Sequence, residues 1–133
     1  MLVDIGRRVW EERPIDLVNG TVNWIWQGDA NDLILRALPL ASSPAEAWNL
    51  THPQPLRVRE VATQFGELFQ KEPRFTGHEA GDSLLSNPHK LSARLGRPPT
   101  PPEQVMAWIA DWIQNGGGNL NKPTHFEVRD GQY

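Results

Sequence analysis

Residues 23–31 hold the side chains of this sequence that are best suited to recognising a small molecule. They join indole rings with carboxamides, in the set Asn23, Trp24, Trp26, Gln27 and Asn31. Carboxamides both donate and accept hydrogen bonds, and large rings cover apolar faces, so the combination suits a hydroxylated or amide-bearing ligand. We therefore take these five residues as candidate substrate-binding residues.

The same segment has a structural interpretation that needs no ligand. In an extended strand Val22, Trp24 and Trp26 point to one side, where both rings can join the core. Gln27 then hydrogen-bonds backbone at the turn. Asp29 acts as the N-cap of a helix rather than as an acid or base, because it directly precedes the apolar helix positions. Both interpretations are compatible with the sequence.

Residues with metal-binding or nucleophilic side chains are present without the spacing that such sites use. His78, Glu79, Asp82 and His89 carry ligand atoms, but no His-x-x-x-His or Glu-x-x-His pair links them. The serines lack the Gly-x-Ser-x-Gly elbow of a hydrolase, and the chain has no cysteine. The sequence therefore predicts no catalytic residue and no metal site among these residues.

Composition limits the class of protein. The 133 residues are 38% hydrophobic and include six Trp, which is enough for one core, so we expect a single domain over residues 1–133. A net charge of -3 without a basic cluster indicates neither a nucleic-acid nor an anionic-membrane partner. Neither a leader pattern nor a long apolar run is present, so a cytoplasmic location is expected.

The first half of the chain shows alternating helix and strand patterns. Apolar positions predict a helix over residues 2–10, and alternation predicts a strand over residues 22–26. A second helix begins near Asp29, with an apolar face at Leu33, Ile34, Ala37 and Leu38. Residues 47–51 suit another short strand.

The second half is richer in helix. The clearest helix has the apolar stripe Val58, Val61, Ala62, Phe65, Leu68 and Phe69. An edge strand is expected at residues 74–77, and a short helix from Asn87 and Pro88 to Gly96.

The final helix follows Thr100 and Glu103, which form a capping-box pattern. Its predicted face is Val105, Met106, Ile109, Trp112 and Ile113. It ends at Gly116, before a polar, Gly-rich tail over residues 116–133. The whole pattern predicts an α/β fold: a small helix-rich domain with two or three short strands, a sheet that would gain from a neighbour.

Five segments carry a resemblance to a known family. They are residues 2–17, residues 22–38, residues 77–96 with the ending Leu95-Gly96, the last helix with Trp108 and Trp112, and residues 122–131. Their order resembles the C-terminal, substrate-domain part of NAD-dependent epimerase/dehydratase enzymes, which are extended short-chain dehydrogenases/reductases. The tail is similar to that of one bacterial branch. The resemblance covers nearly the whole chain, without the family's Rossmann domain.

The parts that carry the chemistry in this family have no counterpart here. The family holds its nicotinamide on a Rossmann domain with a Gly-rich turn, and uses a Tyr assisted by a Lys for proton transfer. Residues 116–118 follow a helix instead of opening one, and the sole Tyr is Tyr133. The resemblance therefore implies no cofactor bound by this chain alone, and NAD or NADP for the intact enzyme.

The resemblance also bears on the substrate. Many relatives that act on nucleotide sugars have Arg where this sequence has Val22 and Glu79, and those cations clamp the diphosphate. Without them a smaller or uncharged substrate is expected.

Three hypotheses about function follow. The first is a substrate-domain fragment, not catalytically complete alone, that pairs with a Rossmann-domain half or self-associates through exposed apolar surface. The second is a free-standing, non-catalytic ligand- or protein-binding domain derived from the family. The third is an unrelated hydrolase or metal enzyme, which would depend on residues such as His78 or His89.

Overall fold

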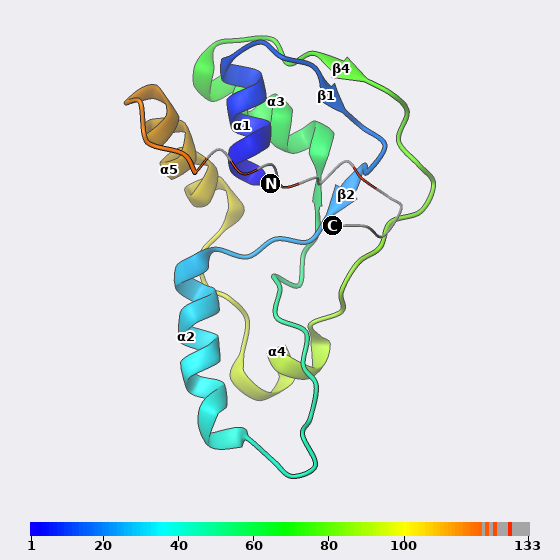
Figure 1. Ribbon diagram of the computed structural model, residues 1–133, viewed down its shortest axis with the longest axis vertical. Helices are drawn as coiled ribbons and strands as arrows, with labels where there is room; N and C mark the ends of the chain where they lie inside the picture. The colour runs from blue at the N-terminus through cyan, green and yellow to red at the C-terminus, as the bar shows by residue number, and fades with distance from the viewer. Residues whose placement is uncertain (121, 123, 125–127, 129–133) are drawn as a thin grey trace.

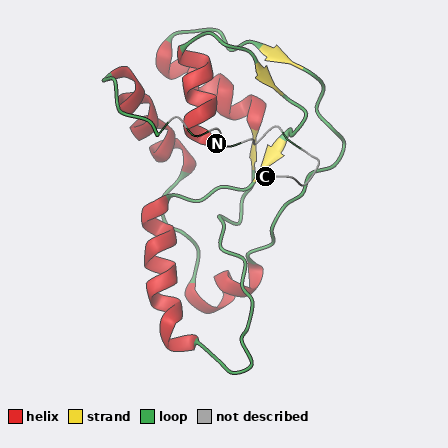
Figure 2. Cartoon of the chain, viewed as in Figure 1, coloured by secondary structure: helices red, strands yellow, loops and turns green. Residues whose placement is uncertain are grey.

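Helices dominate the chain, and every strand in the described part is only two residues long (Figure 2). The computed structural model describes residues 1–120, 122, 124 and 128. The elements follow the order α1 (Leu2–Trp10), β1 (Ile15–Asp16), β2 (Thr21–Val22), α2 (Gln27–Ala37), η1 (Leu38–Leu40), β3 (Leu56–Arg57), α3 (Val58–Phe69), β4 (Phe75–Thr76), α4 (His89–Leu95) and α5 (Pro102–Gln114).

The core lies among α1, α3 and α5, which gather at one end of the elongated molecule (Figure 1). Leu2, Ile5 and Val9 form the buried stripe of α1, as their helical spacing predicts. Phe65 of α3 is completely buried. A Cβ built on Gly6 would lie 3.2 Å from the Phe65 ring, so glycine allows α1 to approach α3 closely. The predicted first and third helices are confirmed.

Two short ladders fasten the loops to this core. β1 pairs with β4 in parallel, with Ile15 opposite Phe75, and β2 pairs with β3 in antiparallel, with Val22 opposite Leu56. The predicted fold class, a small helix-rich α/β domain with few short strands, is confirmed. The predicted edge strand near residue 75 is also present, as β4.

Two strand predictions were too long or wrong. The strand expected over residues 22–26 ends at Val22, and residues 47–51 form no ladder. Irregular tertiary hydrogen bonds take the place of a ladder, because the Trp24 carbonyl accepts bonds from the Thr51 hydroxyl at 3.0 Å and from the His52 amide at 2.7 Å. These contacts join the two segments without a regular sheet.

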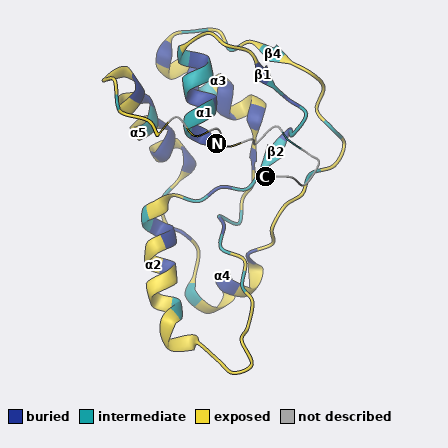
Figure 3. Cartoon of the chain, in the orientation of Figure 1, coloured by how far each residue is buried: buried dark blue, intermediate teal, exposed yellow. Residues whose placement is uncertain are grey.

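The apolar face predicted for α2 is only partly buried. Leu33 is 3% exposed, whereas Ile34 is 49% and Leu38 is 64% exposed. Figure 3 shows α2 and the chain that follows it as mostly exposed, far from the buried residues of α1 and α3. In the described part α2 contacts mainly η1 and α4, so too little structure is packed around it to cover its sides. Leu68 of α3 was also expected in the core and is 42% exposed.

The ends of α4 follow the sequence closely, and the tail is described only in part. Asn87 accepts a 2.9 Å bond from the His89 amide, and Gly96 ends the helix with a φ of 87°. Most of the predicted tail beyond residue 120, including Tyr133, lies outside the described residues. No helix in the described part is long and apolar enough to cross a membrane.

Candidate functional site

Asn23 connects the segment after β2 to the loop before α4. Its Oδ1 accepts a 2.6 Å bond from the Ser86 amide, and its Nδ2 donates to the Ser86 carbonyl at 3.3 Å. Both ends of the carboxamide are therefore used to hold residue 86 in place.

Trp24 belongs to the core, as the structural interpretation of this segment predicts. Its side chain is 5% exposed, its Nε1 donates to the Gln54 carbonyl at 2.8 Å, and its ring stacks on His52 with centroids 4.4 Å apart. These contacts anchor the segment to the loop that carries residues 51–54.

Trp26, Gln27 and Asn31 lie at the beginning of α2 and are exposed. Gln27 does not bond backbone at a turn, because its Nε2 donates to the Asn31 Oδ1 at 2.8 Å, one helical turn later. Trp26 is 37% exposed, and its ring packs against Trp108 of α5 with centroids 5.1 Å apart. The five candidates therefore fall into two groups. Asn23 and Trp24 contact loops of the domain, whereas Trp26, Gln27 and Asn31 are exposed at the start of α2.

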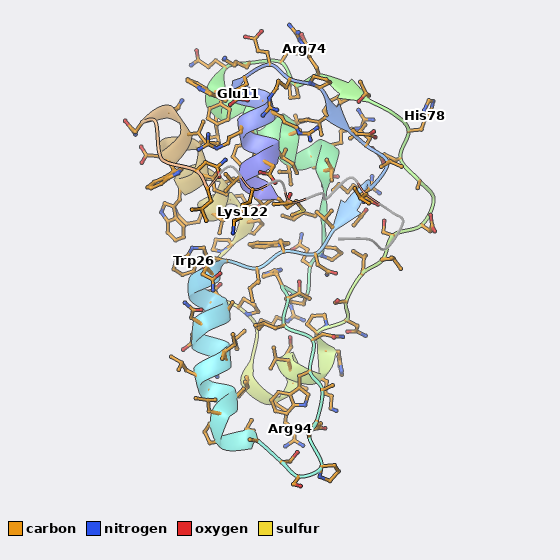
Figure 4. The ribbon with its side chains drawn as sticks, in the orientation of Figure 1. Glu11, Trp26, Arg74, His78, Arg94 and Lys122 are labelled. Atoms are coloured by element: carbon orange, nitrogen blue, oxygen red, sulfur yellow. The ribbon has the colours of Figure 1, made fainter. Side chains whose placement is uncertain are left out.

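Trp26 forms one wall of an open apolar groove between the start of α2 and the helices α1 and α5. Figure 4 shows Trp26 at the upper end of α2, just below α5. The groove, with a volume of about 320 Å³, is here called the tryptophan groove; it is lined by Val3, Trp26, Val105, Trp108, Ile109 and Trp112. None of these six side chains is charged, so the groove is suited to binding apolar surface.

Trp108 and Trp112 were not predicted from the sequence to belong to a site. Trp112 was expected in the core and is 53% exposed, and Trp108 is 45% exposed. Their spacing of four residues places both rings on one face of a helix, which is the signal that could have identified them. That they meet Trp26 depends on tertiary structure.

Asp29 is not the N-cap of α2, and Thr100 does not form a capping box. Helix α2 begins at Gln27, two residues before Asp29, and the Asp29 carboxylate is turned toward the chain before α5. It accepts bonds from the Thr100 amide at 3.1 Å and from the Thr100 hydroxyl at 2.9 Å. Asp29 is 5% exposed. Through these two bonds its buried carboxylate connects the starts of the two helices that carry Trp26 and Trp108.

Charged groups gather elsewhere on the surface. Glu79, which stands where many relatives have Arg, accepts a 2.9 Å bond from Arg59 Nε. Lys90 hydrogen-bonds Glu46 at 2.5 Å, and this bond is the main reason why the pKa of the Glu46 carboxyl is lowered.

Glu46 borders a second hollow of about 340 Å³, beside η1. Among the described residues, no group of three or more His, Asp or Glu side chains could hold a metal ion.

Comparison by sequence finds no relative, whereas comparison of structures does. No protein-family model matches the chain, and no curated protein does. UDP-glucose 4-epimerase of Thermus thermophilus, in complex with NAD, aligns over 85% of this chain with a TM-score of 0.64 and 22% identity. WbmH of Bordetella bronchiseptica, in complex with NAD⁺, aligns over 88% with a TM-score of 0.67 and 16% identity. RMD of Pseudomonas aeruginosa, complexed with NADPH, aligns over 86% with a TM-score of 0.62 and 17% identity.

The match covers only part of each of these enzymes. The chain spans 40% of the Thermus and Bordetella enzymes and 41% of the Pseudomonas enzyme. At these identities the likeness establishes the fold, and the fold is that of a part of NAD-dependent epimerases and related enzymes. The resemblance predicted from the sequence is confirmed at this level.

Proposed function

We propose that this chain is the substrate-domain part of an NAD(P)-dependent epimerase/dehydratase-like oxidoreductase of the bacterial cytoplasm, and that it is not catalytically complete alone. The observation that carries the proposal is the structural match, which takes in most of this chain but two fifths of an NAD-bound epimerase. The tryptophan groove supplies a surface for apolar groups and no acid, base or nucleophile. Hydride transfer would then depend on a partner that brings the cofactor.

The partner in this proposal is a Rossmann-fold polypeptide that binds NAD or NADP. Three fifths of the Thermus enzyme has no counterpart in this chain, and the chain has apolar surface left to cover. That surface, here called the α2 patch, consists of Ile34, Leu35, Leu38 and Leu40, each at least 40% exposed. Helix α2 was expected to bury one apolar face, so we assign the α2 patch to the contact with the Rossmann-fold partner.

Co-expression with the protein encoded immediately upstream tests the proposal. A stable complex is expected to copurify and to enhance the fluorescence of added NADH or NADPH. Leu38→Glu is expected to abolish copurification, because it places a charge in the middle of the contact. Leu84→Glu is the matched control, since Leu84 is 87% exposed outside the α2 patch, and this variant should copurify normally.

The second candidate function is a free-standing, non-catalytic domain that binds a ligand or protein. The observation that favours it is the same exposed apolar surface, which marks interaction sites on soluble domains. A complex that fails to form, together with concentration-dependent self-association in sedimentation that Leu38→Glu removes, would favour this candidate. A complex that binds nicotinamide would exclude it.

A further inference from the structure

The tryptophan groove leaves three large rings partly open to solvent. Trp26, Trp108 and Trp112 are 37%, 45% and 53% exposed, although each ring has enough apolar surface to stabilise a core. Two of the three come from a single face of α5, and the third comes from the opposite wall at the start of α2. The groove therefore presents aromatic surface on two sides.

Glycines leave the space that two of these rings occupy. A Cβ added to Gly28 would overlap the Trp26 ring, and a Cβ added to Gly117 would overlap the Trp112 ring. Trp112 is held further by a 3.3 Å bond from its Nε1 to the Gly118 carbonyl. Trp26 is also held by its ring contact with Trp108. Because the rings are already in place, a ligand would meet a preformed surface and would lose little affinity to ordering it.

The size and chemistry of the groove indicate the class of ligand. A volume of about 320 Å³ is at the lower end of small-molecule sites, and no lining side chain carries a charge. A stable protein contact needs about 800 Å² on each partner. Six residues fall short of that area, and the α2 patch begins about 12 Å farther along the helix, at Ile34. The groove is thus better suited to one small, uncharged molecule than to a protein.

We infer that the tryptophan groove binds an uncharged small molecule through the face of a ring. Flat apolar faces stack on indoles, whereas a phosphate or carboxylate would find no cation among the lining residues. The identification of this molecule as the substrate rests on the proposed function. Its binding by the isolated chain does not rest on that function, so an experiment can contradict either statement without the other.

Fluorescence titration of the purified chain tests the inference with two matched probes. N-phenylnaphthylamine is uncharged, and anilinonaphthalene sulfonate has the same rings with an added anionic group. The uncharged probe is expected to saturate one site per chain and to quench Trp emission by energy transfer. It should bind about tenfold more tightly than the sulfonate, which carries its charge into an apolar groove.

Glycine variants separate this groove from other apolar surface. Gly28→Ala and Gly117→Ala should each weaken binding of the uncharged probe about tenfold, because the added methyl displaces a ring. Gly81→Ala is the control, since its Cβ would meet no atom within 4 Å and the residue does not line the groove, and it should bind like the parent chain. Trp108→Ala is a further variant, which removes a lining ring directly without changing a glycine of the backbone. Circular dichroism would establish that each variant is folded.

Three results would overturn the inference. One is the absence of saturable binding by the uncharged probe, and another is equal affinity for both probes. The third is unchanged binding by Gly28→Ala, Gly117→Ala and Trp108→Ala, which would place the probe on apolar surface outside the groove. A dimer that Trp108→Ala dissociates, without probe binding, would make the groove a contact between copies of the chain instead.

Discussion

The Asp29 carboxylate accepts both the amide and the hydroxyl hydrogen of Thr100, across 71 residues of sequence. Asp29 lies in the first turn of α2, and Thr100 lies two residues before α5 begins. The pair holds together the two helix starts from which Trp26 and Trp108 project. One buried carboxylate thus links the two helix starts that carry opposite walls of the tryptophan groove.

Removing this carboxylate should destabilise the protein. Asp29→Ala is expected to lower the free energy of unfolding by about 2–3 kcal/mol, because two bonds to a buried charged acceptor are lost. Urea unfolding followed by circular dichroism would measure the change. Asp32→Ala is the matched control on the same helix: Asp32 pairs with Arg36 at the surface, and its loss should cost about 0.5 kcal/mol or less. Equal effects of the two substitutions would contradict the role given to Asp29.

The helices of the core could be predicted because their information is local. The stripe from Val58 to Phe69 and the spacing of Leu2, Ile5 and Val9 repeat with the helical period, and each was found where the pattern places it. Exposure was harder to predict, since Leu68 fits the same stripe but is left 42% exposed by the elements that the structure describes.

The tertiary contacts could not be predicted, because the same residues carry a plausible local signal. Asp29 before apolar helix positions resembles an N-cap, and Thr100 three residues before Glu103 resembles a capping box. Their actual partner is each other. In the same way the alternation around Trp24 resembles a strand, yet its carbonyl bonds Thr51 and His52 of an irregular loop. The tryptophan groove combines α1, α2 and α5, which no local pattern connects.

Phe65 should be the most sensitive position of the core. It is completely buried, its ring stacks on Phe69, and it lies against Gly6 of α1. Phe65→Ala is expected to lower the free energy of unfolding by about 3–5 kcal/mol, because the cavity is enclosed by three helices. Leu68→Ala, on the exposed side of the same helix, should cost about 1 kcal/mol or less in the same urea experiment.

The loop contact that replaces the expected strand can be tested separately. Thr51→Val keeps the shape of the side chain but removes its bond to the Trp24 carbonyl, which retains the His52 amide as a donor. We expect a loss of about 1 kcal/mol in the free energy of unfolding. Thr63→Val, which removes an exposed hydroxyl bond on α3, should change it by about 0.5 kcal/mol or less. If the Thr63 variant is the less stable of the two, the loop contact is not a significant anchor.

The ion pair between Lys90 and Glu46 should be visible in a titration. The hydrogen bond from Lys90 favours the charged carboxylate, so the pKa of Glu46 lies below its ordinary value. The stabilisation that this pair contributes is therefore present above the ordinary pKa and is lost as the pH falls through the lowered one. Carbon NMR of the Glu46 carboxyl should show a higher titration midpoint in Lys90→Ala than in the parent chain. Lys71→Ala removes a lysine that pairs with Glu12 instead, and it should leave the midpoint unchanged. A midpoint that does not respond to Lys90→Ala would show that the pair does not persist in solution.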